Sequence, residues 1–446
     1  MDVDVVVVGA GLSGVRTADL LSEAGLSVRI LEASERIGGR AHTIEAGGTF
    51  IDMGGQWIGP DHVRVVALCQ RLGVETFDFH TVGENLLVRG DDIVRFTDSP
   101  PLSHEELSDI EDAEQRIRDL AIRLDPADPM ADAELAALDR ITYGQWIDQN
   151  VSTQAARDYL TMHLRTITCG NENETSALYM VLSERTGPTD GSYEDWRLTG
   201  GAQQLVTGLL DEITGAQGTR ATVEVRNNDP VHLIEQGDES ARVHHASGVT
   251  SARYVVIALS PPMTTRITFS PPLSARRDLM LQRMPMGTVI KFHAVYPTPF
   301  WREDGLSGAS LLVGRSIGQT ADNSPPDASR GVLGFFFYAD ACRSWLDASP
   351  SQRRDAAIAD LVFLFGEQAR EPIAFTEANW CAHEWVRGGY DAVPMPGALG
   401  FDWATLREPV SRVHFCGTET STQWPGYYEG ALVSAQRVAA EILTTS

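Results

Sequence analysis

Cysteine is scarce in this sequence, and the few cysteines present show no motif spacing. They are odd in number and form no C-x-x-C pair: Cys69, Cys169, Cys342, Cys381 and Cys416. This pattern argues against a disulfide framework and against a zinc site, and it is typical of a reducing compartment. We therefore expect a cytoplasmic protein that binds no metal.

The sequence also lacks long apolar runs and an excess of positive charge. No apolar run approaches the ~20 residues that a transmembrane helix needs, and the N-terminal stretch MDVDVVVVGAG lacks the basic flank and cleavage site of a signal peptide. The 36 Lys and Arg residues against 61 Asp and Glu residues give a formal net charge of −25. Because such a surface repels phosphate backbones and anionic lipids, we expect neither nucleic-acid nor membrane partners.

The length and the order of patterns predict an α/β chain with two domains. A chain of 446 residues is long for one hydrophobic core. Its first 40 residues read as strand, helix and strand, and a helix with a capping box of Ser103 and Glu106 is predicted over 103–124. The remaining pattern is helical over about 140–210, extended at 220–227, 230–236, 253–260, around 291 and 331–339, and helical at the C-terminal end.

The stretch GAGLSG carries a G-x-G-x-x-G spacing between the first predicted strand and helix. In that context Gly9 permits a tight turn, Gly11 lets a pyrophosphate approach the backbone, and Gly14 lets helix and strand pack closely. The helix N-terminus offers unpaired N–H groups to the anion. Glu32 ends the second strand, where it accepts hydrogen bonds from ribose hydroxyls. The pattern therefore predicts a dinucleotide site.

Two further blocks near the N-terminus resemble the flavin-dependent amine oxidase superfamily. ERIGGRAHT brings Gly38, Gly39 and Arg40 directly after Glu32, and IDMGGQWIGP matches the next block of that group with Gly54, Gly55, Gln56 and Trp57. The C-terminal stretch VHFCGTETSTQWPGYYEGALVSAQRVAAEIL is similar to the flavin block of monoamine and putrescine oxidases. The resemblance implies FAD contacts at Gly417, Thr418, Glu419, Gly426, Gly430 and Ala431, and an adenine contact through the backbone of Val231.

The resemblance implies a fold in two discontinuous parts. It is an α/β fold, α+β overall, in which a glutathione-reductase-like Rossmann FAD domain carries an inserted mixed α/β substrate domain. We expect the FAD domain to comprise residues 1–78, 205–282 and 391–446, and the substrate domain to comprise residues 79–204 and 283–390.

Lys291 lies in the middle of the predicted strand MGTVIKFHAVY. The period-2 pattern places it with Val289, His293 and Val295 on one face. By strand pattern alone it also fits a lysine that extends along a sheet edge to solvent. The surrounding residues 286–308 look most like putrescine oxidase. In this family the matching lysine holds a water against flavin N5, and its charge stabilises a superoxide-like intermediate.

Two tyrosines match the family's aromatic cage. In WCAHEWVRGGYDAVPMPG, Trp380 and Tyr390 keep the spacing of the monoamine oxidase block, and Tyr427 in WPGYYEG matches the other ring. Gly389 occupies the place of the cysteine that links to the flavin in mammalian-type enzymes. The resemblance therefore implies non-covalent FAD. Each tyrosine alone also fits ordinary packing. Cys416 and His293 fit inert core positions better than catalytic ones.

The implied reaction is oxidation of a primary or secondary amine to an imine that hydrolyses to an aldehyde, with transfer of a hydride or its equivalent to the flavin and reduction of O2 to H2O2. Putrescine oxidases carry an acid for the distal ammonium, where this chain aligns Thr320. We therefore expect a monoamine with an apolar or aromatic tail, in a pocket of Leu178, Tyr179, Thr320 and Phe335–Phe337. A shift of one or two residues brings Asp322 to that place and restores a diamine.

Two other activities stay open at this point. An L-amino-acid oxidase shares both flavin blocks but needs an arginine for the substrate carboxylate, and Arg64 and Arg165 are candidates. A flavin-binding interaction protein without oxidase activity is the non-enzymatic alternative. The expected partners are a small-molecule amine and O2, and the sequence leaves open whether a second copy completes a homodimer.

Overall fold

The predicted N-terminal strand–helix–strand unit forms the middle of an eight-stranded sheet in the computed structural model, which describes residues 1–97, 99–187, 194–215 and 220–445. Strand β1 (Val3–Val8) lies between β2 (Val28–Leu31) and β13 (Gly248–Ile257) and is parallel to both. The sheet order is β10-β2-β1-β13-β12-β11-β14, with β20 also paired to β13. The other bounds are β10 (Val223–Arg226), β12 (Ala241–His245), β11 (Val231–Gln236), β14 (Thr268–Ser270) and β20 (Val413–Phe415).

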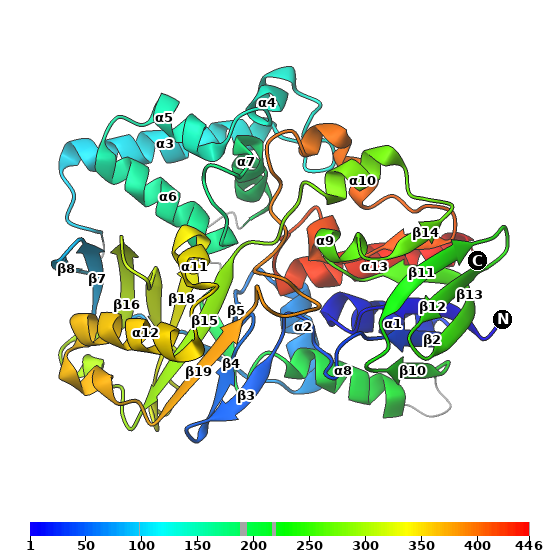
Figure 1. Ribbon diagram of the computed structural model, residues 1–446, viewed down its shortest axis with the longest axis horizontal. Coiled ribbons are helices and arrows are strands. Elements are labelled where there is room, and N and C mark those ends of the chain that lie inside the picture. The colour runs from blue at the N-terminus through cyan, green and yellow to red at the C-terminus, as the bar shows by residue number, and fades with distance from the viewer. Residues whose placement is uncertain (98, 188–193, 216–219, 446) are drawn as a thin grey trace.

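Helices cover one face of this sheet and bury the valine-rich β1. The main core joins alternate residues of β1 to the apolar stripes of these helices. They are α1 (Leu12–Glu23), α2 (Val63–Leu72), α8 (Gln204–Gly215) and α13 (Tyr428–Thr445). Val6 and Val8 pack in a second core on the other face, and strands of a parallel sheet that are buried on both faces read as continuous apolar runs. Figure 1 shows this part of the molecule on the right, with both chain ends at its edge.

A second sheet of seven strands has the order β19-β15-β18-β17-β16-β7-β8. The bounds are β7 (Glu84–Arg89), β8 (Asp92–Phe96), β15 (Val289–Tyr296), β16 (Leu306–Val313), β17 (Gln319–Asp322), β18 (Gly331–Tyr338) and β19 (Ala374–Asn379). One face packs against α12 (Pro350–Phe365), and α11 (Ala339–Trp345) follows β18. The strands of the two sheets come from separate segments of the chain, and the domain boundaries given above stay a prediction.

Strand β15 is buried on both faces, which is unusual for a strand with a lysine at its centre. Ile290 and Phe292 join the core beneath α12. The alternation places Lys291 on the other face, and the side chain is only 3% exposed. A lysine at a solvated sheet edge is therefore excluded.

A helical layer lies above the second sheet (Figure 1). It comprises α3 (His104–Arg123), α4 (Ala133–Leu138), α5 (Tyr143–Asn150), α6 (Gln154–Thr168) and α7 (Ala177–Thr186). The predicted capping box is confirmed, because Glu106 N donates to Ser103 Oγ (3.2 Å) and Ser103 N donates to Glu106 Oε2 (2.8 Å).

Small elements connect these layers. A three-stranded sheet of order β5-β9-β6 and the β3-β4 hairpin lie between the two large sheets along the chain. Their bounds, with those of the remaining short helices, are β3 (Thr43–Ala46), β4 (Thr49–Asp52), β5 (Trp57–Ile58), β6 (Thr76–Asp78), β9 (Trp196–Leu198), α9 (Pro261–Thr264), α10 (Ala275–Leu281), η1 (Phe300–Arg302), η2 (Glu367–Arg370), η3 (Leu399–Phe401), η4 (Trp403–Leu406) and η5 (Thr418–Thr420).

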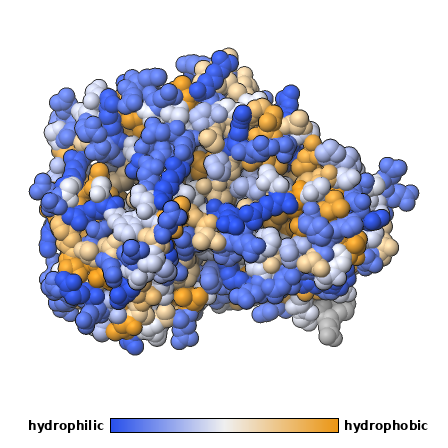
Figure 2. All heavy atoms as spheres, viewed as in Figure 1, coloured by the Kyte–Doolittle hydropathy of each residue, from blue (hydrophilic) through white to orange (hydrophobic). Residues whose placement is uncertain are grey.

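The surface visible in Figure 2 is mainly hydrophilic. Figure 2 shows hydrophilic residues over most of the visible face, with hydrophobic residues in scattered groups. Within the described part of the chain, no helix combines the length and the apolar character that crossing a membrane requires.

Candidate active site

One large cavity, of about 1080 Å³, joins the N-terminal glycine turn to the faces of the second sheet and the helical layer. Residues from β1, α1, β15, β18, α6, α7 and the C-terminal segment line it. Segments that lie far apart in the sequence therefore meet at one site.

The glycine turn has the geometry that the sequence predicts. Gly9 adopts φ +103°, a backbone conformation that residues other than glycine rarely adopt. A Cβ on Gly14 would lie 2.1 Å from the Gly9 carbonyl oxygen, so glycine is required for the close helix–strand packing. A Cβ on Gly11 would meet no atom within 4 Å, and Gly11 lines the cavity. This open space directly before α1 suits an anion that needs backbone contact.

Glu32 lies at the edge of the cavity and is 7% exposed. Its Oε2 accepts a hydrogen bond from Ala10 N and its Oε1 one from Ser34 N, both at 2.8 Å. A carboxylate oxygen has further lone pairs, so Glu32 keeps acceptor capacity for hydroxyl donors in the cavity. Gly39 and Val231 line the same part of the cavity.

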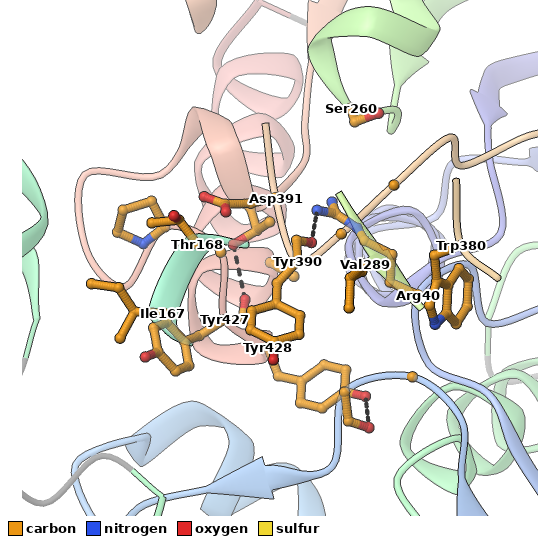
Figure 3. A pocket seen from close by; sticks show the side chains of 18 of the residues that line it. Arg40, Ile167, Thr168, Ser260, Val289, Trp380, Tyr390, Asp391, Tyr427 and Tyr428 are labelled. Carbon is orange, nitrogen blue, oxygen red and sulfur yellow. Dashed lines mark hydrogen bonds between the residues drawn. The ribbon is translucent and has the colours of Figure 1, made fainter. Parts of the chain in front are cut away.

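Arg40 and Glu419 connect the two ends of the chain. Arg40 Nη1 donates to Glu419 Oε1 (2.8 Å) and to the Tyr390 carbonyl oxygen (2.8 Å), and the latter bond is visible in Figure 3. Burial opposes the charge of Arg40, but the charge and hydrogen bonds of Glu419 outweigh that effect, so the pKa of Arg40 is raised. Glu419 was expected to contact the cofactor. Instead it is buried behind Arg40, which lines the cavity.

The C-terminal segment contributes backbone to the same cavity. Gly417, Gly426 and Ala431 line it, as expected from the sequence. Gly430 does not line it and serves packing, because a Cβ there would lie 2.1 Å from the Trp424 carbonyl oxygen. The turn that carries Gly426 leads directly into α13.

Lys291 contacts the segment of Gly54 to Trp57 at the cavity wall. Its Nζ donates to the Gly54 carbonyl oxygen (2.8 Å) and to Gln56 Oε1. The amide of Gln56 is oriented in turn by Asn323, which accepts from Gln56 Nε2 at 2.9 Å. Trp57 and Gly55 also line the cavity. The role of Asn323 was not foreseen, because nothing in its local sequence marks it.

The electrostatic state of Lys291 is set mainly by burial. Desolvation lowers the pKa of Lys291 to about 7, partly opposed by the charge of Asp52. The ammonium also lies 5.4 Å from the ring centroid of Phe336 and 5.5 Å from that of Trp57. His293, on the same strand face, is buried, and its Nε2 accepts a hydrogen bond from Asn323 Nδ2 (3.1 Å). Burial holds the pKa of His293 well below its usual range.

Tyr390 and Tyr427 both line the cavity, from segments on either side of β20 (Figure 3). The ring of Tyr390 lies edge-on to Phe336, with centroids 6.1 Å apart. Burial raises the pKa of Tyr390 well above its ordinary value. The ring of Tyr427 packs edge-on to Trp424 at 5.4 Å. Gly389 precedes Tyr390 and lines the cavity as well.

Trp380 borders the cavity through its ring and is anchored through its indole nitrogen. Nε1 donates to the Met53 carbonyl oxygen at 2.9 Å, and the ring stacks on His383 at 5.5 Å. The spacing from Trp380 to Tyr390 therefore brings both rings to one cavity.

Of the six residues expected in the substrate pocket, three line the cavity and three, Leu178, Phe335 and Phe337, do not. Tyr179 and Thr320 line the cavity. Leu178 is fully buried in the core between α7 and α10, because adjacent residues of a helix point in different directions. Phe337 lies in the core beneath α12, because it pairs with Ile290 and shares its face of the sheet. Phe336, which pairs with Lys291, lines the cavity instead.

Two buried carboxyl groups, Asp391 at the cavity and Asp322 outside it, have different surroundings. Asp391, missed by the sequence interpretation although it follows Tyr390, accepts a hydrogen bond from Tyr179 Oη at 2.8 Å. Burial raises the pKa of Asp391 to about 7. Asp322 does not line the cavity, since its carboxylate accepts from Trp301 Nε1 (2.8 Å) and Arg302 Nε (2.7 Å).

The arginines considered for a substrate carboxylate are engaged elsewhere. Arg64 pairs with Glu429 (2.9 Å) and Arg165 pairs with Glu172 (2.8 Å), and neither lines this cavity. The described residues contain no cluster of His, Cys, Asp and Glu that could hold a metal ion.

The cavity joins a glycine turn that suits a pyrophosphate to a buried lysine near two aromatic rings. These features are typical of a dinucleotide-dependent oxidoreductase. The family model for flavin-containing amine oxidoreductases matches residues 12–443. The chain is 33% identical to a probable flavin-containing monoamine oxidase A of Dictyostelium discoideum, over 98% of this chain and 97% of that protein. It is 31% identical to an L-amino acid dehydrogenase of Synechocystis sp., over 99% of this chain and 94% of that protein.

The solved structure of a putrescine oxidase bound to putrescine superposes with a TM-score of 0.93. It is 30% identical and covers 100% of this chain and 99% of that chain. The chain belongs to the flavin-containing amine oxidase family and is an oxidoreductase of that class. The family implies FAD, and the residues present fit this cofactor: the free space at Gly11 suits a pyrophosphate, and the acceptor capacity of Glu32 suits a ribose.

Proposed function

We propose that the chain holds FAD without a covalent link and oxidises a primary or secondary monoamine with an apolar or aromatic tail. The product is an imine that hydrolyses to an aldehyde, and O2 is the electron acceptor that becomes H2O2. The observation that carries this proposal is that Lys291, Tyr390 and Tyr427 line the same cavity as the glycine turn.

The dinucleotide would be held along one wall of the cavity. Gly11 and the N-terminus of α1 would bind the pyrophosphate together with Arg40, Glu32 would accept from the ribose, and Val231 would lie against the adenine. Flavin supplies the hydride acceptor when it is bound. Gly389 offers no thiol, and no described residue lining the cavity is a cysteine, which supports non-covalent attachment.

Lys291 has one donor left for the cavity. An ammonium has three N–H donors, and Gly54 and Gln56 accept two of them. The third is available to a water or an oxygen species, and the positive charge would stabilise negative charge that develops there. Tyr390 and Tyr427 would orient the amine, because aromatic faces attract its nitrogen.

The walls beyond the tyrosines favour an apolar tail. They include Phe79, Leu86, Phe96, Ile117, Leu160 and Ile167. At the position where a diamine oxidase needs an acid, Thr320 donates its hydroxyl to the Gly308 carbonyl oxygen at 2.7 Å and offers no charge.

A diamine is the alternative that two observations favour. Glu114 and Glu184 line the far end of the cavity, and the chain resembles a putrescine oxidase throughout. Glu114, however, accepts from Tyr159 Oη (3.2 Å) and pairs with Arg118 (3.6 Å). Burial raises the pKa of Glu184, which weakens its use as a charged anchor.

The decisive experiment is a peroxide-release screen of the purified holoenzyme. We expect phenylethylamine and tyramine to exceed putrescine in kcat/KM, and amino acids such as phenylalanine to be inactive. Anaerobic bleaching of the oxidised flavin band by the same amines separates oxidation from O2 reduction. A preference for putrescine or for amino acids would reverse the substrate assignment, and bleaching by no amine would leave a flavin-binding protein. The cytoplasmic location and the oligomeric state stay predictions.

A further inference from the structure

An acidic side chain that the sequence interpretation passed over lies at the reactive end of the cavity. Glu194 comes two residues before β9, and β9 pairs with β5, where Trp57 lies opposite Arg197. Because Trp57 follows Gln56, the hydrogen-bond partner of Lys291, this pairing brings Glu194 to the wall that carries Lys291. Glu194, Lys291 and Tyr390 all line the cavity.

The carboxyl group of Glu194 has no protein partner among the described residues. It forms no hydrogen bond or ion pair with any of them, and the residue is exposed and lines the cavity. A substrate that fills the cavity would cover this carboxylate, and burying an ionised carboxylate without a partner is costly. The group therefore either takes up a proton or receives a cation from the cavity.

The ionisable groups that face Glu194 are few. The charge of Lys291 on β15 lowers the pKa of Glu194, and the charge of Glu194 raises the pKa of Tyr390. The charge of Asp52 on β4 raises the pKa of Lys291, and the charge of Arg197 on β9 lowers it. Burial raises the pKa of Glu194 to about 7, and the positive charge of Lys291 only partly opposes this.

The pKa of Lys291 also indicates how the cavity changes the pKa of a primary amine. Its own alkylammonium group lies in this cavity, and burial lowers the pKa of Lys291 from 10.5 to about 7. A substrate ammonium that enters the same environment is desolvated in the same way. Proton transfer from such an ammonium to a carboxylate of similar acidity then costs little free energy.

We propose that Glu194 binds the ammonium group of the incoming substrate and accepts its proton, leaving a neutral amine between Tyr390 and Tyr427. This inference rests on the proposed amine oxidation. In the step one N–H bond breaks and one O–H bond forms on Glu194, and no electron changes hands. The lone pair that is released on nitrogen is what amine oxidation requires.

Other acids at the cavity are less suited to this role. Asp391 is already the acceptor of the Tyr179 hydroxyl and lies beside the Arg40–Glu419 pair. Glu114 is engaged by Tyr159 and Arg118 at the far end. Asp195, the adjacent acid, also lines the cavity, and it is the matched control because Glu194, and not Asp195, acts on the charge of Lys291.

The first test compares Glu194→Gln with Asp195→Asn in the pH dependence of kcat/KM. The parent should rise to a plateau above a pH of about 7. E194Q must capture the neutral amine from water, so its kcat/KM should keep rising toward the pKa of the amine in solution, about 10. We expect a loss of about 10- to 100-fold at pH 8 that shrinks to less than about threefold at pH 10, whereas D195N keeps the parent profile. An E194Q profile equal to that of the parent would overturn the proposal.

The second test counts protons without turnover. An amine with no α-hydrogen, α,α-dimethylbenzylamine, can bind but cannot be oxidised. Calorimetry of the holoenzyme at pH 8 in two buffers of different ionisation enthalpy should show about no proton released by the parent and D195N, and about one released by E194Q. Equal release from the parent and E194Q would overturn the role of Glu194. If the parent oxidises no amine at any pH, the proposed function itself fails instead.

Discussion

Arg40 and Glu419 lie 379 positions apart in the sequence and form a two-point ion pair. The pair joins the loop after Glu32 to the turn before α13, and Arg40 also holds the Tyr390 carbonyl oxygen. The N-terminal and C-terminal flavin blocks therefore become one wall through a contact that neither block specifies alone.

Removing one member of this pair should destabilise the protein strongly. Glu419→Ala leaves the Arg40 charge without its main partner, which we expect to cost about 3–5 kcal/mol of unfolding free energy. The double variant Arg40→Met with Glu419→Met should recover most of that loss, because it leaves no unpaired charge. Urea unfolding of the apoproteins measures both. Equal stability of the single and the double variant would contradict this account.

Lys291→Met should separate reduction from reoxidation. We expect normal FAD content and near-normal anaerobic reduction by amine, but reoxidation by O2 slowed by about 10²-fold, as for loss of a charged group that stabilises an anionic state. Stopped-flow mixing of the reduced enzyme with O2 gives the rate. Reoxidation at the parent rate would remove the assigned role of the lysine.

The charge of Lys291 should also appear in the pH dependence of reoxidation. Because burial lowers the pKa of Lys291 to about 7, its ammonium is present below that pH and lost above it. The rate of reoxidation should therefore fall as pH rises through about 7, whereas the K291M rate stays flat over this range. A parent rate that increases with pH would show that another group controls the step.

Alanine substitutions at two glycines of the turn should have different effects, one on FAD binding and the other on stability. Gly11→Ala places a methyl group in open cavity, so the apoprotein should keep its melting temperature while FAD binds at least about tenfold more weakly. Gly14→Ala directs its Cβ at the Gly9 carbonyl oxygen, so the fold itself should be destabilised. Thermal unfolding and flavin titration of the apoproteins distinguish the two. Loss of fold in G11A would refute the assignment of that space to a ligand.

An acid at the cavity wall should convert substrate preference. Thr320→Glu introduces a charge for a distal ammonium, and a charge-assisted hydrogen bond is worth about 1.5–3 kcal/mol. The ratio of kcat/KM for putrescine to that for phenylethylamine should rise by roughly 10- to 150-fold. Thr320→Val, which removes the same hydroxyl without adding charge, should leave the ratio unchanged. A similar ratio in both variants would place the diamine subsite elsewhere.

Local patterns in the sequence were sufficient for part of the secondary structure and for the glycine turn, but they did not predict β7, β8, β16, β17, β19 or α12. The capping box of Ser103 and Glu106 and the strand–helix–strand start depend on residues a few positions apart, so their spacing determines them. The resemblance to a family extended this to Lys291, Tyr390 and Tyr427, each at a motif position.

The expected substrate-pocket residues differ from the residues that line the cavity where the expectation depended on which way a side chain points. Phe335, Phe336 and Phe337 are alike in sequence, and only the pairing of Phe336 with Lys291 selects the ring that faces the cavity. Likewise Leu178 and Tyr179 are neighbours on α7, yet only Tyr179 reaches the cavity and Asp391.

By itself, the sequence determined several elements of this protein, among them the strand–helix–strand start, and the glycine turn between them, because these follow from short-range geometry. Only the tertiary structure decided that Asn323 orients Gln56 toward Lys291, and that the carboxyl of Glu194 shares a cavity with that lysine. Such pairs are far apart along the chain, and strand register and burial, which no local pattern encodes, decide which polar groups meet and which protons they hold.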